Sequence, residues 1–81
     1  EAWSKGLMTE ALNAVIGETF RGLKLHRIEA MHFTDNPASG RVMAKAGMSF
    51  EGRLRQRIYN KGRFADVDIY AILRKDFHPI P

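Results

Sequence analysis

The apolar residues between positions 7 and 23 recur every three or four residues along the chain. This spacing predicts a helix that buries one face, because side chains three and four positions apart lie on the same side of a helix. Polar residues such as Glu10, Asn13 and Glu18 fall between the apolar ones. The positions expected on the buried face are Met8, Ala11, Leu12, Val15, Ile16, Phe20 and Leu23.

Residues 25–33 predict a strand, since Ile28 and Ala30 alternate with Arg27 and Glu29. Alternation with a period of two is typical of a strand that places one face against a core. We therefore expect one strand directly after the first helix.

A second helix is predicted over residues 37–46. Asn36 suits the position that caps a helix start, and Pro37 suits the first helical position. Gly47 suits the left-handed position just after a helix end. The side chains expected to face inward are Val42, Met43 and Ala46, and those expected to face outward are Arg41 and Lys45.

The C-terminal half predicts a β-hairpin. Residues 50–59 and 64–73 read as strands, and the sequence Asn-Lys-Gly at residues 60–62 supplies the turn between them. In the second strand Val67, Ile69, Ala71 and Leu73 alternate with Asp66, Asp68, Tyr70 and Ile72. The order of elements is thus helix, strand, helix, strand, strand, which indicates the α/β fold class.

Length and composition limit the architecture. A chain of 81 residues can bury one modest core, so one domain or part of one is the limit. Because the first residue is Glu1 and not methionine, we expect a piece of a longer protein. The absence of cysteine excludes disulfides and thiolate metal sites. No apolar run approaches the roughly 20 residues of a membrane span, and we expect a soluble, cytoplasmic protein that does not cross a membrane.

The charge of the chain favours anionic partners. Thirteen Lys and Arg against nine Asp and Glu give a formal net charge of +4. Phosphates of a nucleotide carrier such as coenzyme A, or of a nucleic acid, are the natural candidates, and an ordinary solvated basic surface is the alternative. Arg53, Arg55 and Arg57 lie two apart, so in a regular strand they form one cationic stripe. Such a stripe suits an acidic peptide or RNA, or it simply keeps an exposed sheet face in solvent.

The segment Lys5–Thr9 is a candidate phosphate site, because Gly6 is expected to open the first helix. Backbone N–H groups without partners and the helix dipole, equivalent to about half a positive charge, attract a pyrophosphate at such a position. Lys5 adds a full charge. The alternative is a plain helix N-terminus without a ligand.

The motifs together resemble the C-terminal half of an N-acetyltransferase of the GNAT superfamily. Asn-x-x-Ser at residues 36–39, followed by Gly-Met-x-Phe-Glu-Gly at residues 47–52, is similar to the branch that includes ribosomal-protein alanine acetyltransferases. The likeness covers nearly the whole chain. It implies that residues 1–81 form the C-terminal part of a single GNAT domain whose N-terminal strands are absent. It also implies transfer of acetyl from acetyl-CoA to a primary amine, which in this branch is a protein N-terminus.

The resemblance implies a binding site for the coenzyme. Residues 3–8 align with the loop that cradles its pyrophosphate, although Trp3 and Met8 depart from the family pattern at two of three diagnostic positions. The residues implied in coenzyme binding are Lys5, Gly6, Leu7, Met8, Thr9 and Asn36.

The resemblance also implies catalytic roles for Asn36 and Ser39. In related enzymes this Asn contacts the pantetheine arm or the tetrahedral intermediate, and a hydroxyl on the same helix protonates the departing thiolate. Other branches place a tyrosine where this chain has Met43, which leaves Ser39 as the hydroxyl. The general base is expected in the absent N-terminal half, since the local titratable residues have no family counterpart. Those residues are His26, His32, Glu29 and Glu51.

Other partners follow from the pattern of strands and from the family. Tyr59, Tyr70 and Asp66 recur in this branch and are expected to shape the acceptor pocket, with core packing as the alternative for Tyr70.

One edge of the strand over residues 25–33 is expected to lack a neighbour, which favours self-association or strand exchange between molecules, or else very low stability.

Three functions remain open on sequence grounds. The first is acetylation of a protein N-terminus, with little or no turnover expected from the isolated 81 residues. The second is acetylation of a small-molecule amine, and the third is a basic nucleic-acid-binding module without catalysis.

Overall fold

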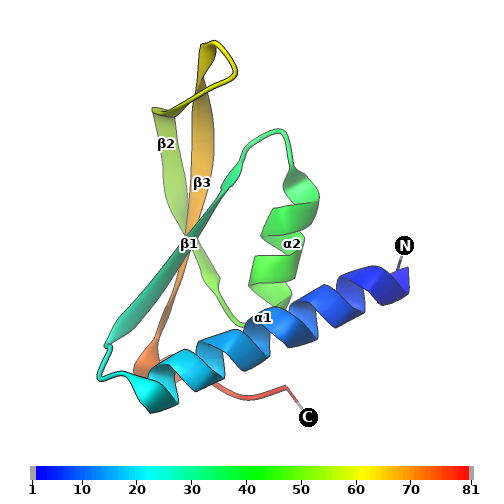
Figure 1. Ribbon diagram of the computed structural model, residues 1–81, viewed down its shortest axis with the longest axis vertical. Helices are drawn as coiled ribbons and strands as arrows, with labels where there is room; N and C mark the ends of the chain where they lie inside the picture. The colour runs from blue at the N-terminus through cyan, green and yellow to red at the C-terminus, as the bar shows by residue number, and fades with distance from the viewer. Residues whose placement is uncertain (1, 81) are drawn as a thin grey trace.

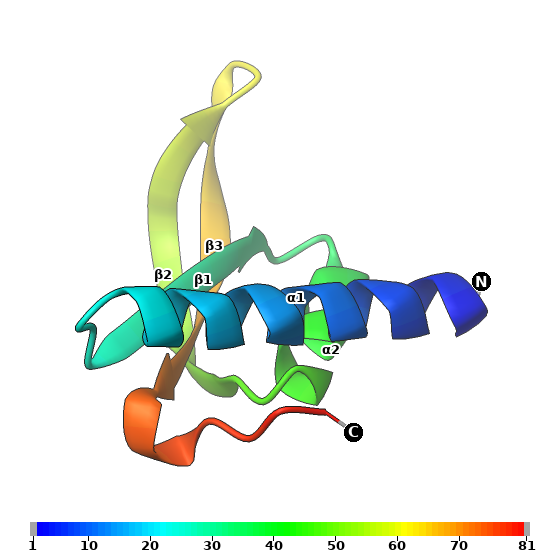
Figure 2. The same cartoon turned by 60° about the horizontal axis from the view of Figure 1, so that its bottom comes forward.

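The computed structural model describes residues 2–80, and it confirms the expected order of elements (Figure 1). Both helices lie on one face of a three-stranded antiparallel sheet. The molecule is flat, with extents of 39 × 32 × 18 Å. The hairpin projects beyond the helices (Figure 2). The elements are α1 (Ala2–Gly22), β1 (Arg27–Phe33), α2 (Pro37–Lys45), β2 (Ser49–Asn60), β3 (Arg63–Leu73) and a short 3₁₀ helix η1 (Arg74–Asp76).

The helix α1 begins four residues earlier than expected, at Ala2, so the expectation that Gly6 opens it was wrong. No proline interrupts residues 2–9, and a single glycine inside a helix costs only about 1 kcal/mol, which favourable neighbours offset. Only the first turn of a helix leaves N–H groups without partners. The backbone N–H groups of Gly6 to Thr9 therefore lie inside the helical ladder.

The buried face of α1 also differs from the expected one. Ile16 and Phe20 are buried as expected, whereas the exposed fractions of Met8 and Val15 are 57% and 60%. Asn13, expected among the polar positions between the apolar ones, is only 5% exposed. The packing of α1 against α2 and the C-terminal tail determines which face of α1 is buried. The spacing of apolar residues alone does not determine it.

The helix α2 ends as the sequence predicts. Gly47 has a φ of +109°, its N–H donates to the Ala44 carbonyl, and the N–H of Met48 donates to the Met43 carbonyl. These two bonds form the Schellman motif that glycine favours at this position. Val42 and Ala46 face inward and are buried, as expected.

The strand order is β1-β3-β2, and all pairs are antiparallel. The expected hairpin is present, and its turn residues Lys61 and Gly62 have φ values of 51° and 81°, the positive φ at both positions that a type I′ turn requires. β1 pairs regularly with β3 from Arg27 to Phe33 and forms one edge of the sheet.

β2 is irregular, and this corrects the expected arginine stripe. Between the pairs that Leu54 and Ile58 make with β3, four steps along β2 match two along β3. Gln56 lies in this bulge with a φ of 53°. The strict alternation that would align Arg53, Arg55 and Arg57 is therefore interrupted, and the three line a shallow hollow around the bulge.

The core lies between the helices and one face of the sheet. Its buried residues are Ile16, Phe20, Ala46, Met48 and Ile72. The tail after η1 runs back along α1 (Figure 2), where Phe77 packs against Phe20 with a ring separation of 5.9 Å. Neither described helix combines the length and apolar character needed to cross a bilayer.

Candidate functional site

Asn36 and Ser39 lie in the turn that joins β1 to α2. The N–H of Asn36 donates to the Phe33 carbonyl at 3.0 Å, and the N–H of Ser39 donates to the Asn36 carbonyl at 3.2 Å. Asn36 occupies the N-cap position as expected, but its side chain makes no capping hydrogen bond. Its exposed amide is thus free of a role within the helix, and it lies one turn from the half-buried Ser39.

His32 lies beneath this turn, on the last part of β1. Its side chain is 6% exposed, and Nδ1 lies 2.7 Å from the Phe33 carbonyl oxygen. Because a carbonyl oxygen only accepts, Nδ1 must carry the hydrogen of this bond. Nε2 is buried without a hydrogen-bond partner among the described residues and lies 3.8 Å from a carboxylate oxygen of Asp68.

Gly40 explains how α2 approaches the sheet so closely. A Cβ at this position would lie 2.8 Å from Nε2 of His32 and 2.9 Å from the hydroxyl of Tyr70. Tyr70 packs on the core and against Phe50, with ring centroids 5.6 Å apart. Core packing therefore accounts for Tyr70. The turn with Asn36 and Ser39 therefore packs on the sheet at Gly40, which has no side chain to hold it away.

An ion pair adjoins the histidine. Arg53 of β2 donates from Nε and from a terminal nitrogen to the two carboxylate oxygens of Asp68, at 2.9 and 3.3 Å. These bonds lower the pKa of the Asp68 carboxyl below its usual value and raise the pKa of the Arg53 guanidinium. Asp68 is therefore held in its ionised form next to His32.

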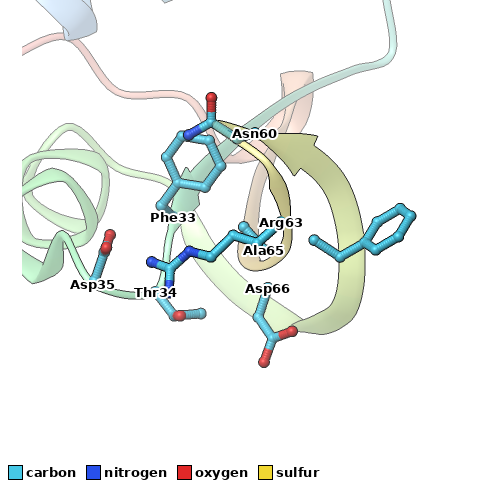
Figure 3. Close-up of a pocket in the computed structure, with 8 residues that line it drawn as sticks. Phe33, Thr34, Asp35, Asn60, Arg63, Ala65 and Asp66 are labelled. Carbon is cyan, nitrogen blue, oxygen red and sulfur yellow. The ribbon is translucent and has the colours of Figure 1, made fainter.

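A hollow of about 270 Å³ opens between the end of β1 and the hairpin (Figure 3). Two carboxylates, of Asp35 and Asp66, line it together with the side chain of Arg63. Asp66 accepts a hydrogen bond from the Gln56 N–H at 2.8 Å, whereas Asp35 has no ion pair with the described side chains of residues 6–80. The remaining lining residues are Phe33, Thr34, Asn60, Phe64 and Ala65. Tyr59 lies near this end of the hairpin but packs edge-on against Phe64.

The segment Lys5–Thr9 lies within α1 and is helical, whereas the family resemblance implied a loop that cradles the pyrophosphate. The space beside Gly6 is open, because a Cβ there would meet no atom within 4 Å. The hydroxyl of Thr9 is buried and lacks a hydrogen-bond partner among the described residues. Leu7 and Met8 are exposed. The side chain of Lys5 lies outside the part of the chain that the structure describes.

Comparison with known proteins identifies the family. The model of the acetyltransferase (GNAT) domain matches residues 1–49, which include both the Gly6 segment and the Asn36 turn. The chain belongs to the GNAT acetyltransferase family. The resemblance seen in the sequence and the expected fold class are thereby confirmed.

Individual GNAT proteins match most of this chain and less than half of their own length. The uncharacterized N-acetyltransferase YoaA of Bacillus subtilis is 40% identical over 91% of this chain and 42% of its own. The crystal structure of a ribosomal-protein-S5-alanine acetyltransferase from Vibrio fischeri matches with a TM-score of 0.80 at 31% identity, over 91% of this chain and 40% of that one. A spermidine N-acetyltransferase from Vibrio cholerae, solved in complex with CoA and spermine, matches with a TM-score of 0.80 at 26% identity, over 89% and 43%.

Sequence reasoning missed several residues that organise this region. Gly40 carried a signal in the sequence, because a glycine inside a helix often marks a position where another part of the protein packs closely against the helix. Asn13 carried one too, since it lies four residues after Thr9 and three before Ile16, on the face that the helix buries. The pair of Arg53 and Asp68 had no signal, because its register depends on the bulges of β2.

Proposed function

We propose that the chain is the C-terminal part of a single N-acetyltransferase domain, which transfers an acetyl group from acetyl-CoA to a primary amine. The observation that carries this proposal is the family match over residues 1–49, a range that holds the Lys5–Thr9 segment and the Asn-x-x-Ser motif at residues 36–39. The proposed acceptor is a protein N-terminus. The similarity to the ribosomal-protein-S5-alanine acetyltransferase supports this choice. We propose a cytoplasmic location together with this acceptor.

The acyl donor is proposed to bind with its phosphates at the N-terminal end of α1, along residues Lys5–Thr9. The positive charge of Lys5 favours anions there. The open space beside Gly6 lets a large group approach the backbone. The free amide of Asn36 is proposed to contact the pantetheine arm.

The reaction assigns a role to Ser39. After a base has taken the ammonium proton, the amine nitrogen attacks the thioester carbonyl carbon and the carbon–sulfur bond breaks. The nitrogen loses a second proton and the sulfur gains one, which leaves an amide and a free thiol. Ser39 is proposed to hydrogen-bond the sulfur as its charge develops, because stabilising a developing charge lowers the barrier. The base that accepts the proton of the attacking ammonium is assigned to the part of the domain that precedes this chain.

The acceptor is proposed to enter through the hollow lined by Asp35 and Asp66. The two carboxylates outweigh the single Arg63 guanidinium in the hollow and attract an ammonium group, and the Asp35 carboxylate has no ion pair within the described residues. Asp35 directly precedes Asn36 in sequence, so an amine held there is close to the proposed thioester site. The two carboxylates also favour a second candidate acceptor, a polyamine, as in the Vibrio cholerae spermidine N-acetyltransferase.

The donor half of the proposal is tested by binding. Calorimetric titration of the 81-residue chain with acetyl-CoA should show one site, and acetyl-CoA should raise the melting temperature of the chain in proportion to the logarithm of its concentration. RNA that binds in a salt-sensitive manner, with no effect of acetyl-CoA on melting, would instead support the nucleic-acid module.

The proposed acceptor is tested by measuring turnover. The protein used is the product of the full reading frame that contains this chain. An alanine-starting peptide and spermidine are compared by release of free coenzyme A thiol. Asp35→Asn and Asp66→Asn should raise KM for the true acceptor several-fold, and Asp76→Asn, a matched change at an exposed site on η1, should leave KM unchanged. Equal KM values in all four proteins would remove the hollow from the proposal.

A further inference from the structure

The carbonyl oxygen of Phe33 accepts two hydrogen bonds at the point where β1 ends. One comes from Nδ1 of His32 at 2.7 Å, and the other comes from the backbone N–H of Asn36 at 3.0 Å. The second bond closes the turn that carries Asn36 to the start of α2. The imidazole therefore acts on the same atom that fixes the position of Asn36.

This bond is the only hydrogen bond of the imidazole within residues 2–80. Asp68 lies 3.8 Å away, beyond hydrogen-bond distance, and both of its oxygens accept from Arg53. Gly40 also packs closely against the ring, because a Cβ at position 40 would collide with Nε2 of His32. A buried ring with a single donor bond, held in place by close packing, is suited to fix one carbonyl.

We propose that His32 is a positioning residue for Asn36. Its Nδ1–H holds the Phe33 carbonyl, the carbonyl holds the Asn36 amide, and the turn is thereby set for the acyl donor. The inference rests on the proposed function for the role of Asn36 and deepens it. His32 touches neither substrate in this arrangement and takes no proton from them.

The chemistry of the bond provides matched variants. An asparagine side chain places an N–H donor where imidazole places Nδ1, whereas a glutamine reaches the position of Nε2 and leaves Nδ1 without a replacement. His32→Asn should therefore keep the bond to Phe33, and His32→Gln and His32→Leu should lose it. His26→Leu is the control, because His26 is exposed and its side chain makes no hydrogen bond with the described residues.

The first measurement is NMR of the unliganded chain. The nitrogen shifts of His32 in the wild type should show a protonated Nδ1. Exchange of the Asn36 amide proton with solvent should be at least three times faster in His32→Gln and His32→Leu than in the wild type, and unchanged in His32→Asn. A ring protonated at Nε2 alone in the wild type would overturn the inference without any variant.

The second measurement is the Kd for coenzyme A, taken from the calorimetric titration. Losing one positioning bond should raise Kd by three- to tenfold in His32→Gln, the size expected for a single hydrogen bond, with His32→Asn within twofold of the wild type. If the wild type binds and all variants bind equally, the inference fails and the proposed function stands. If the wild type does not bind coenzyme A, the proposed function fails, while the NMR result still decides whether His32 fixes the turn.

Discussion

The side-chain nitrogen of Asn13 on α1 lies 3.0 Å from the carbonyl oxygen of Ala46 at the end of α2. The same amide group also holds the tail, because its nitrogen donates to the His78 carbonyl at 3.2 Å and its oxygen accepts from the Ile80 N–H at 3.0 Å. One buried side chain thus joins the first helix, the second helix and the C-terminal segment.

Replacing Asn13 should therefore destabilise the fold. Asn13→Ala leaves the buried Ala46 carbonyl without its partner and releases the tail, and we expect the free energy of unfolding to fall by about 1–3 kcal/mol. Urea denaturation measures the change. Glu10→Ala, an exposed change on the same helix, should stay within about 0.5 kcal/mol of the wild type. Equal free energies of unfolding in the two variants would show that the hydrogen bonds of Asn13 add nothing to stability.

Gly40→Ala should also destabilise, although alanine favours helices by about 1 kcal/mol. The new Cβ would meet His32 and Tyr70 at less than 3.0 Å, and overpacking of this kind costs about 1–3 kcal/mol. Gly22→Ala, where a Cβ meets nothing within 4 Å, is the control and should be neutral or slightly stabilising. The melting temperatures of the two variants test this prediction. A Gly40→Ala variant more stable than the wild type would contradict the close packing of α2 on the sheet.

Gly6→Ala should separate stability from binding. The position is helical and open, so alanine should raise the free energy of unfolding by about 0.5–1 kcal/mol. If the phosphates of coenzyme A approach the backbone here, the methyl group should weaken their binding several-fold. Calorimetry and melting on one sample give both values. Unchanged affinity would move the phosphate site away from Gly6.

The ion pair of Arg53 and Asp68 should make stability depend on pH in the acid range. The pKa of Asp68 is lower in the folded protein than in the unfolded one, so between the two values the unfolded state binds more protons. Stability from this pair is present above pH about 4 and is lost as pH falls through the lower, folded value. Asp68→Asn should show a smaller loss of melting temperature between pH 5 and pH 2 than the wild type. Identical slopes would show that the pair adds nothing in solution.

Self-association should proceed through β1 and not through β2. Both are edge strands, but β2 is interrupted by bulges and carries arginines, which discourage pairing, whereas β1 is regular over all seven residues. Met31→Lys places a charge on this regular edge, where the side chain is 41% exposed, and should shift the chain toward monomer in sedimentation experiments. Leu54→Lys on β2 is the comparison and should change association less.

Local signals in the sequence predicted most of the elements, and long-range packing decided what they missed. Gly47 and the Lys61-Gly62 turn need positive φ values that sequence chemistry makes visible, and both are present. The face of α1 was mistaken, because a helix with apolar residues on two sides is oriented only by its neighbours. The bulge at Gln56 and the ion pair of Asp68 depend on how β2 aligns with β3, and one strand cannot show this alone.

The candidate site divides in the same way. The turn with Asn36 and Ser39 was visible from its own residues, whereas the His32 imidazole beneath it was passed over because it has no family counterpart. A histidine next to a carbonyl acceptor has no sequence signature, since the bond depends on the geometry of the strand end. The assumed start of α1 at Gly6 was wrong because helical propensity extends through a single glycine.

The far end of the hairpin, from Gln56 to Phe64, extends past both helices (Figure 2). The buried core residues lie outside this segment, so a substitution at the exposed tip residue Lys61 leaves the packed interior unchanged. Loop tips of this kind tolerate changes of sequence and length at little cost in folding free energy.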